Sequence, residues 1–400
     1  MKKCLEVLCV TALTLCWTYA CEVVDNDPDK HMDNRDTTAV GLEEVAKILA
    51  SVPLQHIQLQ EVIDAVASSS GNGYDEEYTM KNLFLSPGAG VGDKDTKEGK
   101  AYDEPLRKLI EDYLWSEYLT KSDGRDPETV INALTESDIQ IYWPFSEKWD
   151  GETMPVITFD PEDGSEVNVG YKIMTDKGFR QVEEVLVDEA SAESMPVWVV
   201  NRNSDAGYTS LEMLRREDPG WGEGGGTIVV RPPENGTRVS EPLRSLILKD
   251  FTMKRNYDTW FAGASEFFVK TGFVDDFTAS TEAELKLYNP LVTDFMIVVR
   301  RSQVGEPQPF NAMIMSDWSP QMTHCAFMIT EDDGGTQTDW STKAKVFVAG
   351  KSYGVELTIP LNTRDDIVWR GQIASRWLEE YSNVTSHFGD VDLTFEVVER

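Results

Sequence analysis

Two acidic loops hold the residues of this chain whose spacing suits a metal ion. The loop EDDGGTQTD at 331–339 places Asp332, Asp333 and Asp339 around two glycines, and DPEDGSE at 160–166 carries four further acids. A hard cation such as Ca²⁺ takes about six to eight oxygen ligands, and carboxylates supply them. Neither loop has EF-hand spacing, and hairpin turns use Asp and Gly for backbone reasons. Both loops are therefore expected to be turns, with Ca²⁺ bound by Asp332, Asp333 and Asp339 as the alternative.

The segment NYDTWFAGASEFF at 256–268 is the second candidate for chemistry. Asp258, Trp260 and Glu266 interrupt an apolar strand pattern around Gly263. A glycine inside a strand permits a bulge or a close approach of another backbone. One interpretation is a polar pocket formed by Asp258, Trp260 and Glu266, with the tryptophan as its aromatic wall. The other is a pair of strands that buries Trp260 in a core.

Motifs of several enzyme classes are absent from the sequence. Its four histidines form no HExxH, there is no GxSxG, and the glycine-rich GWGEGGG at 220–226 lacks the Lys-Ser/Thr of a P-loop. This pattern favours a non-catalytic binding or structural role. The alternative is a hydrolase in which a protonated and an ionised carboxyl work as a pair, with or without calcium, and glycans are its candidate substrate. With 70 Asp and Glu residues, the sequence does not identify that pair.

The charge of the chain limits its partners. Its 400 residues contain 37 Lys and Arg against 70 Asp and Glu, a formal net charge of −33. Phosphate backbones and anionic membrane surfaces are bound through Lys and Arg, so neither nucleic acid nor direct membrane attraction is expected. An acidic surface attracts cations. Aromatic side chains exposed on strands could stack on sugar rings, so a glycan or a protein is the expected ligand class.

The amino terminus resembles a targeting segment. Lys2 and Lys3 precede an uncharged, mostly apolar run at 7–17, which is shorter than the roughly 20 residues that span a bilayer. The run has the length of a signal-peptide core, which predicts a signal peptide at 1–20. An ordinary secretory signal cut elsewhere is the alternative.

Cysteine positions add to this interpretation. Four of the five cysteines lie within the first 21 residues, so removal of residues 1–20 leaves Cys21 and Cys325. Cys325 lies in the apolar run HCAFMI, which favours a buried strand residue. A modified Cys21 would leave Cys325 without a disulfide partner.

The stretch TYAC at 18–21 resembles the lipobox of bacterial lipoproteins, in its relaxed Bacteroidota form. Ala20 and Cys21 match that motif, whereas Thr18 departs from its usual leucine. The acids of 22–29 resemble the stretch that accompanies export to the outer face of the outer membrane. The resemblance implies lipid on Cys21 as the membrane anchor and a surface-exposed outer-membrane lipoprotein of the cell envelope. Stretches such as NGYDEEY and GASEF are similar to those of uncharacterised Bacteroidota lipoproteins, for which no activity is implied.

The remaining pattern predicts an α+β fold. Apolar residues at three-and-four spacing indicate a helical region at 37–138 after an acidic tether at 21–36. Short runs rich in Val, Ile and aromatic residues indicate a β-rich middle domain at 139–205. A connector is expected at 206–240. The strands of 241–400 predict an antiparallel β-sandwich, loosely similar to C2 domains.

Overall fold

The structure is a computed structural model. The residues that it describes are 40–93, 100–120, 125–176, 179–203, 207–217, 243–275, 277 and 279–399. Four of the sequence predictions lie wholly or partly outside them: the signal peptide (1–20), Cys21, the tether (21–36) and most of the connector (206–240). Within these residues, no helix has both the length and the apolar character needed to cross a membrane.

Helices dominate the first part of the described chain, as the apolar spacing predicts. Their bounds are α1 Leu42–Ser51, α2 His56–Gly71, α3 Met80–Leu85, α4 Leu106–Thr120 and α5 Pro127–Glu136. The start of α5 shows how the sequence sets a helix end. The Asp126 side chain accepts a hydrogen bond from the Thr129 N–H (3.0 Å), and Pro127 occupies the first helical position, where no N–H is needed.

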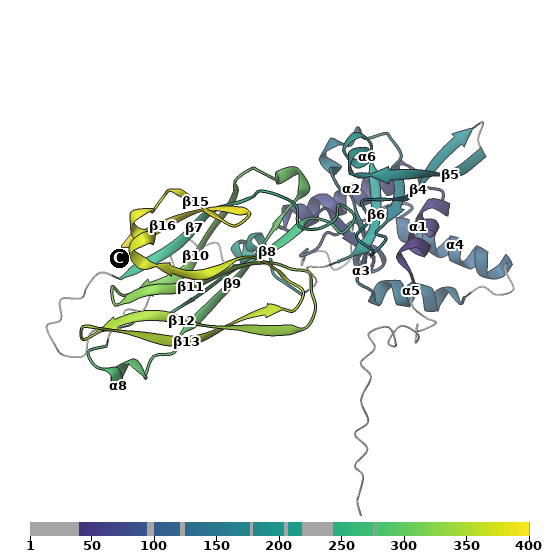
Figure 1. Cartoon of the computed structure of the whole chain (residues 1–400). Helices are drawn as coiled ribbons and strands as arrows, with labels where there is room; N and C mark the ends of the chain where they lie inside the picture. The colour runs from purple at the N-terminus through teal and green to yellow at the C-terminus, as the bar shows by residue number, and fades with distance from the viewer. Residues whose placement is uncertain are drawn as a thin grey trace, which may run out of the picture. The chain divides into compact units, whose positions relative to one another are not determined.

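A six-stranded sheet packs against these helices (Figure 1). Its strands are β1 Glu77–Thr79, β2 Ile139–Tyr142, β3 Val156–Phe159, β4 Val167–Asp176, β5 Phe179–Asp188 and β6 Val197–Arg202. The order is β1-β2-β6-β3-β4-β5, in which only the β3–β6 pair is parallel. Short helix α6 (Glu189–Ser194) joins β5 to β6. Leu49 of α1, Val62 of α2 and Trp198 of β6 belong to one buried cluster. The expected division at 138/139 therefore lies within a single core.

Within the predicted helical region at 37–138, the segment 74–88 is only partly helical. Only α3 is helical, while Glu77–Thr79 forms β1 and pairs with β2. Asp75 and Glu76 are buried instead of lying in an exposed first helical turn. Pairing with a distant strand overrides the local helical preference here.

The remaining strands form two antiparallel sheets with a shared core (Figure 1). One sheet has the order β10-β7-β16-β15, and the other has the order β13-β12-β11-β8-β9 with β14 also paired to β11. Their bounds are β7 Arg244–Met253, β8 Ser265–Phe273, β9 Leu291–Val299, β10 Gln308–Trp318, β11 Met322–Glu331, β12 Gln337–Val348, β13 Lys351–Asn362, β14 Asp366–Ala374, β15 Thr385–Phe388 and β16 Val391–Glu399. Three short helices accompany them: α7 Leu211–Glu217, α8 Glu282–Leu285 and α9 Ser375–Glu380. The predicted α+β fold with a C-terminal β-sandwich is confirmed.

Cys325 lies in β11 and is fully buried, with a free thiol. Burial raises the pKa of this thiol to about 12. The thiol is therefore a small core side chain, as the apolar run HCAFMI indicates, and it is protonated at neutral pH.

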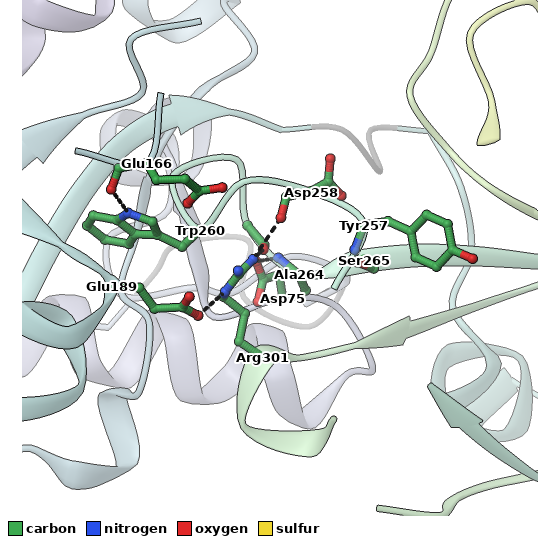
Figure 2. A network of polar contacts seen from close by, with 10 residues as sticks. Asp75, Glu166, Glu189, Tyr257, Asp258, Trp260, Ala264, Ser265 and Arg301 are labelled. Carbon is green, nitrogen blue, oxygen red and sulfur yellow. Dashed lines mark hydrogen bonds and ion pairs between the residues drawn. The ribbon is translucent and has the colours of Figure 1, made fainter. Parts of the chain in front are cut away.

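The sandwich contacts the helical and β-rich part through the loop before β8 (Figure 2). The Ala264 N–H donates to Asp75 Oδ2 (2.9 Å), and the Trp260 indole N–H donates to the Glu166 carbonyl (3.0 Å). Gly263 has φ +132°, and a Cβ placed on it would lie 2.8 Å from Asp75 Oδ2. A glycine is needed here both for the backbone angle and for the close approach of Asp75.

Candidate metal centre

Glu331 is the last residue of β11 and has the smallest exposed fraction among the acids of the sandwich that the structure describes. It pairs with Phe267 of β8 on one side and with Asp366 of β14 on the other. Strand alternation places it on the same face of β11 as Phe327 and Ile329, which belong to the core. Its exposed fraction is 0%. The fold thus places a carboxyl group inside the end of an apolar core.

Asp258 reaches the same place from the loop before β8, and Arg301 holds that loop (Figure 2). The Arg301 guanidinium donates to the carbonyl oxygens of Asp258 (3.2 Å) and Gly263 (3.3 Å). It also donates to the Glu189 carboxylate (2.6 Å), which partners its charge. The Asp258 carboxyl points away from this guanidinium in Figure 2 and remains available to other groups.

Asp333 completes a group of three carboxyls, two residues beyond the end of β11. One side-chain oxygen each of Asp258, Glu331 and Asp333 lies within 4.8 Å of the other two. Glu331 is buried, Asp258 is half-buried and Asp333 is exposed, so the group opens to solvent on the Asp333 side. We call these three residues the acidic centre.

Neither carboxyl oxygen of Glu331 accepts a hydrogen bond from an N–H or O–H group in the described part of the chain. The polar group close to it is the Asp258 carboxyl. The two carboxyls form a hydrogen bond only when one of them carries a proton. A buried polar atom without a partner costs about 1–3 kcal/mol, and more when it is charged. The pair therefore needs either a shared proton or a cation.

The electrostatics of the acidic centre agree with that requirement. Burial raises the pKa of Glu331 far above its ordinary value, and Asp258 and Asp333 raise it further. Burial also raises the pKa of Asp258. Burial, followed by the negative charges of its neighbours, raises the pKa of Asp333 to about 6. Asp258 disfavours ionisation of both Glu331 and Asp333, whereas the hydrogen bond from Glu331 lowers the pKa of Asp258. A bound cation would relieve the repulsion at Glu331 and Asp333.

The ligand atoms of the acidic centre determine which class of metal ion it suits. The acidic centre supplies oxygen only, with neither sulfur nor imidazole among its three residues. Oxygen ligands suit hard cations, and Ca²⁺ accepts carboxylates in mono- or bidentate form at about 2.3–2.6 Å. Waters entering beside Asp333 would complete the six to eight oxygens. The residues present thus fit Ca²⁺.

The predicted metal ligands are only partly brought together. Asp333 belongs to the acidic centre. Asp332 is buried and serves its own loop, because its Oδ1 accepts hydrogen bonds from the Gly334 N–H (2.9 Å) and Asn362 Nδ2 (3.0 Å). Asp339 is an exposed residue of β12 outside the centre, which corrects the expectation that all three acids act together.

The second acidic loop is a turn, which is the simpler of its two interpretations. Asp160 accepts a hydrogen bond from the Glu162 N–H (2.9 Å), and Asp163 accepts one from the Ser165 N–H (2.9 Å). Such bonds from Asp to the backbone two residues on are typical of turns. The Glu162 carboxylate forms an ion pair with Arg202 (2.7 Å), so its charge is balanced by an arginine of the same chain.

The predicted pocket of Asp258, Trp260 and Glu266 is not formed. Trp260 is fully buried and packs on Phe261 with ring centroids 4.0 Å apart, so it lines no open pocket. Glu266 is a buried residue of β8. Of the three, Asp258 alone enters the acidic centre. Trp260 is buried in a core, as the alternative interpretation expects, but it lies in the loop before β8 and not in a pair of strands. Its core includes Tyr142 of β2 and Val199 of β6.

Sequence reasoning missed Glu331, although a signal for it exists. Within CAFMITE, a period of two places Glu331 in line with Phe327 and Ile329, and an acid at a core position of a strand is unusual. Comparison with protein-family models, curated proteins and solved structures gave no match. The interpretation of the centre therefore depends on its geometry alone.

Proposed function

We propose that this chain is a lipid-anchored cell-envelope protein with a binding role, and that its β-sandwich holds Ca²⁺ at Asp258, Glu331 and Asp333. One observation carries the metal proposal. Among the described residues, neither oxygen of the fully buried Glu331 has a hydrogen-bond donor, and one of the two lies within 4.8 Å of an oxygen of Asp258 and of Asp333. A bound cation satisfies all three groups at once, whereas a shared proton satisfies only one pair.

Location is proposed from the sequence. TYAC at 18–21 supports lipid attachment at Cys21, and the acids that follow support a place on the outer face of an outer membrane, as in Bacteroidota lipoproteins. Cys21→Ala should abolish metabolic labelling with a radioactive fatty acid and move the protein out of the membrane fraction. Unchanged labelling would refute the anchor. Cys325→Ala is the matched control, and it should leave labelling intact.

A binding role accounts for the acidic centre better than catalysis does. The hydrolase alternative would use the protonated Glu331 as an acid beside an ionised carboxyl. Glu331 is 0% exposed, however, so a substrate does not reach it in this structure. A metal ion would approach from the side of Asp333, the exposed member of the centre. The fold then gains a cross-link between the loop that carries Asp258 and the end of β11.

Thermal unfolding with Ca²⁺ and with the chelator EGTA tests the metal proposal. A ligand that binds only the folded state at 100 times its Kd adds about 2.7 kcal/mol to the free energy of unfolding. Ca²⁺ should raise the unfolding temperature of the wild type and of Asp339→Asn. It should not raise that of Glu331→Gln. Equal unfolding temperatures of the wild type in Ca²⁺ and EGTA would refute the proposal.

A further inference from the structure

A cavity of about 250 Å³ lies near the acidic centre, and its lining combines aromatic side chains with charged ones. Its wall includes Tyr208, Phe268, Lys270, Asp294, Asn362 and Asp365. We call it the Tyr208 pocket. Its volume lies just below the range of about 300–1,000 Å³ that holds drug-sized ligands, so its occupant is about one ring in size. Asn362 Nδ2 donates to Asp332, the residue between Glu331 and Asp333, which joins the pocket to the acidic centre.

One wall of the pocket is aromatic and fixed in place. The Tyr208 side chain packs edge to face on Phe268, with ring centroids 4.7 Å apart, and Tyr208 is 38% exposed. Its carbonyl oxygen accepts a hydrogen bond from the Tyr74 hydroxyl (3.0 Å), which anchors the backbone. A partly exposed ring held in this way offers an apolar surface to a flat ligand.

The polar wall carries an ammonium beside a carboxylate. Lys270 Nζ lies 3.3 Å from Asp294 Oδ2 and donates to the Pro360 carbonyl (2.8 Å). These two contacts use two of the three N–H donors of the ammonium. The Lys270 side chain is only 6% exposed, whereas that of Asp294 is 35% exposed. The pocket thus offers a reachable acceptor next to a donor, with the two charges offsetting each other.

This lining selects its ligand by exclusion. A simple anion would be repelled by Asp294 and Asp365. A simple cation would have to displace the Lys270 ammonium from Asp294 and from the Pro360 carbonyl. A neutral ring with adjacent hydroxyls avoids both penalties, because each hydroxyl donates to a carboxylate and accepts from an ammonium. The apolar face of such a ring would lie on the Tyr208 ring. Neutral sugars have both features.

We propose that the Tyr208 pocket binds a neutral pyranose sugar, with Tyr208 as the stacking residue and the Lys270–Asp294 pair as the hydroxyl-binding group. This inference rests on the proposed binding role and names its ligand class. It does not require the metal, because none of Asp258, Glu331 and Asp333 lines the pocket.

Saturation-transfer NMR on the full chain carrying Cys21→Ser tests this proposal. The probes are the methyl glycosides of glucose, galactose, mannose and N-acetylglucosamine, with glycine and alanine as zwitterionic comparisons. At least one glycoside should receive saturation, and Tyr208→Ala should weaken its binding about tenfold, the loss expected for one stacking contact. Tyr208→Phe keeps the ring and should retain binding.

The matched control is Tyr381→Ala, which removes a tyrosine of similar exposure (40%) that stacks on Trp377. It should leave glycoside binding unchanged. Absence of transfer to every glycoside, transfer to the amino acids alone, or equal binding by Tyr208→Ala would each overturn the pocket proposal.

Repeating the titration in EGTA separates the two proposals. Glycoside binding in a protein that shows no response to Ca²⁺ would overturn the metal centre and support the pocket. A Ca²⁺ response without glycoside binding would overturn the pocket and leave the metal centre standing.

Discussion

Replacing Glu331 with glutamine should make the metal-free protein more stable, although the change removes a native side chain. Glutamine has almost the same shape as glutamate, and its amide group donates to the Asp258 carboxylate. The wild-type oxygens have no donor within the described residues. In EGTA the wild type satisfies this pair only by taking up a proton at Glu331 when it folds, because the pKa of Glu331 is raised. Glutamine avoids that cost, so the free energy of unfolding in EGTA at neutral pH should rise by about 1–3 kcal/mol.

Calcium should remove the stability advantage of the Glu331→Gln variant over the wild type. At 100 times its Kd, Ca²⁺ adds about 2.7 kcal/mol to the wild type. The variant gains little, because a neutral amide replaces the buried carboxylate ligand. The difference in stability between the two proteins should therefore shrink to near zero or change sign when Ca²⁺ replaces EGTA.

Urea unfolding followed by tryptophan fluorescence measures both effects, since the chain contains 11 Trp. Asp339→Asn is the matched control, because Asp339 is an acid of the same loop region outside the acidic centre. It should behave as wild type in both buffers. A Glu331→Gln protein that is less stable than wild type in EGTA, or that keeps the full Ca²⁺ response, would refute the reasoning.

Three further predictions concern the contact between the sandwich and the rest of the chain. Gly263→Ala should lower the unfolding temperature by more than Gly151→Ala does, because both have positive φ but only the Gly263 Cβ would meet Asp75; equal effects would contradict this. Arg301→Met should destabilise the protein by about 1–3 kcal/mol in urea, since it leaves two carbonyl oxygens and the partly exposed Glu189 carboxylate without their donor; a loss below about 0.5 kcal/mol would argue against a structural role. Burial raises the pKa of Asp75 from 3.8 to about 6, so the folded state holds this proton more tightly and loses stability as pH rises from about 4 to 6, by up to about 3 kcal/mol. Asp75→Asn should flatten that part of the curve of urea midpoint against pH, and an unchanged slope would contradict the assignment.

Local sequence signals predict much of the fold. The DPET motif places Asp126 as the cap of α5, and runs such as CAFMITE and GVELTIPL become β11 and β13. These features depend on capping and on periodicity, which neighbouring residues encode. Strand β1 was missed because its three residues become a strand only by pairing with β2, far along the chain.

The acidic centre was only partly predictable, for the same reason. Asp333 was selected because acids and glycines gather in one loop. Asp258 joins it through a loop that Arg301 holds, and Arg301 lies after two intervening strands. Asp339 belongs to the same acidic stretch, four residues after Gly335, yet it lies within β12 and remains exposed. Composition of a loop indicates which residues could bind a metal, whereas the tertiary fold decides which of them converge.

A crystal structure grown in millimolar Ca²⁺ tests the central claim most directly. The account predicts an ion bound by Asp258, Glu331 and Asp333, with oxygens at about 2.3–2.6 Å from it. An acidic centre without an ion, in which the Asp258 and Glu331 oxygens lie about 2.5–2.7 Å apart and share a proton, would contradict it.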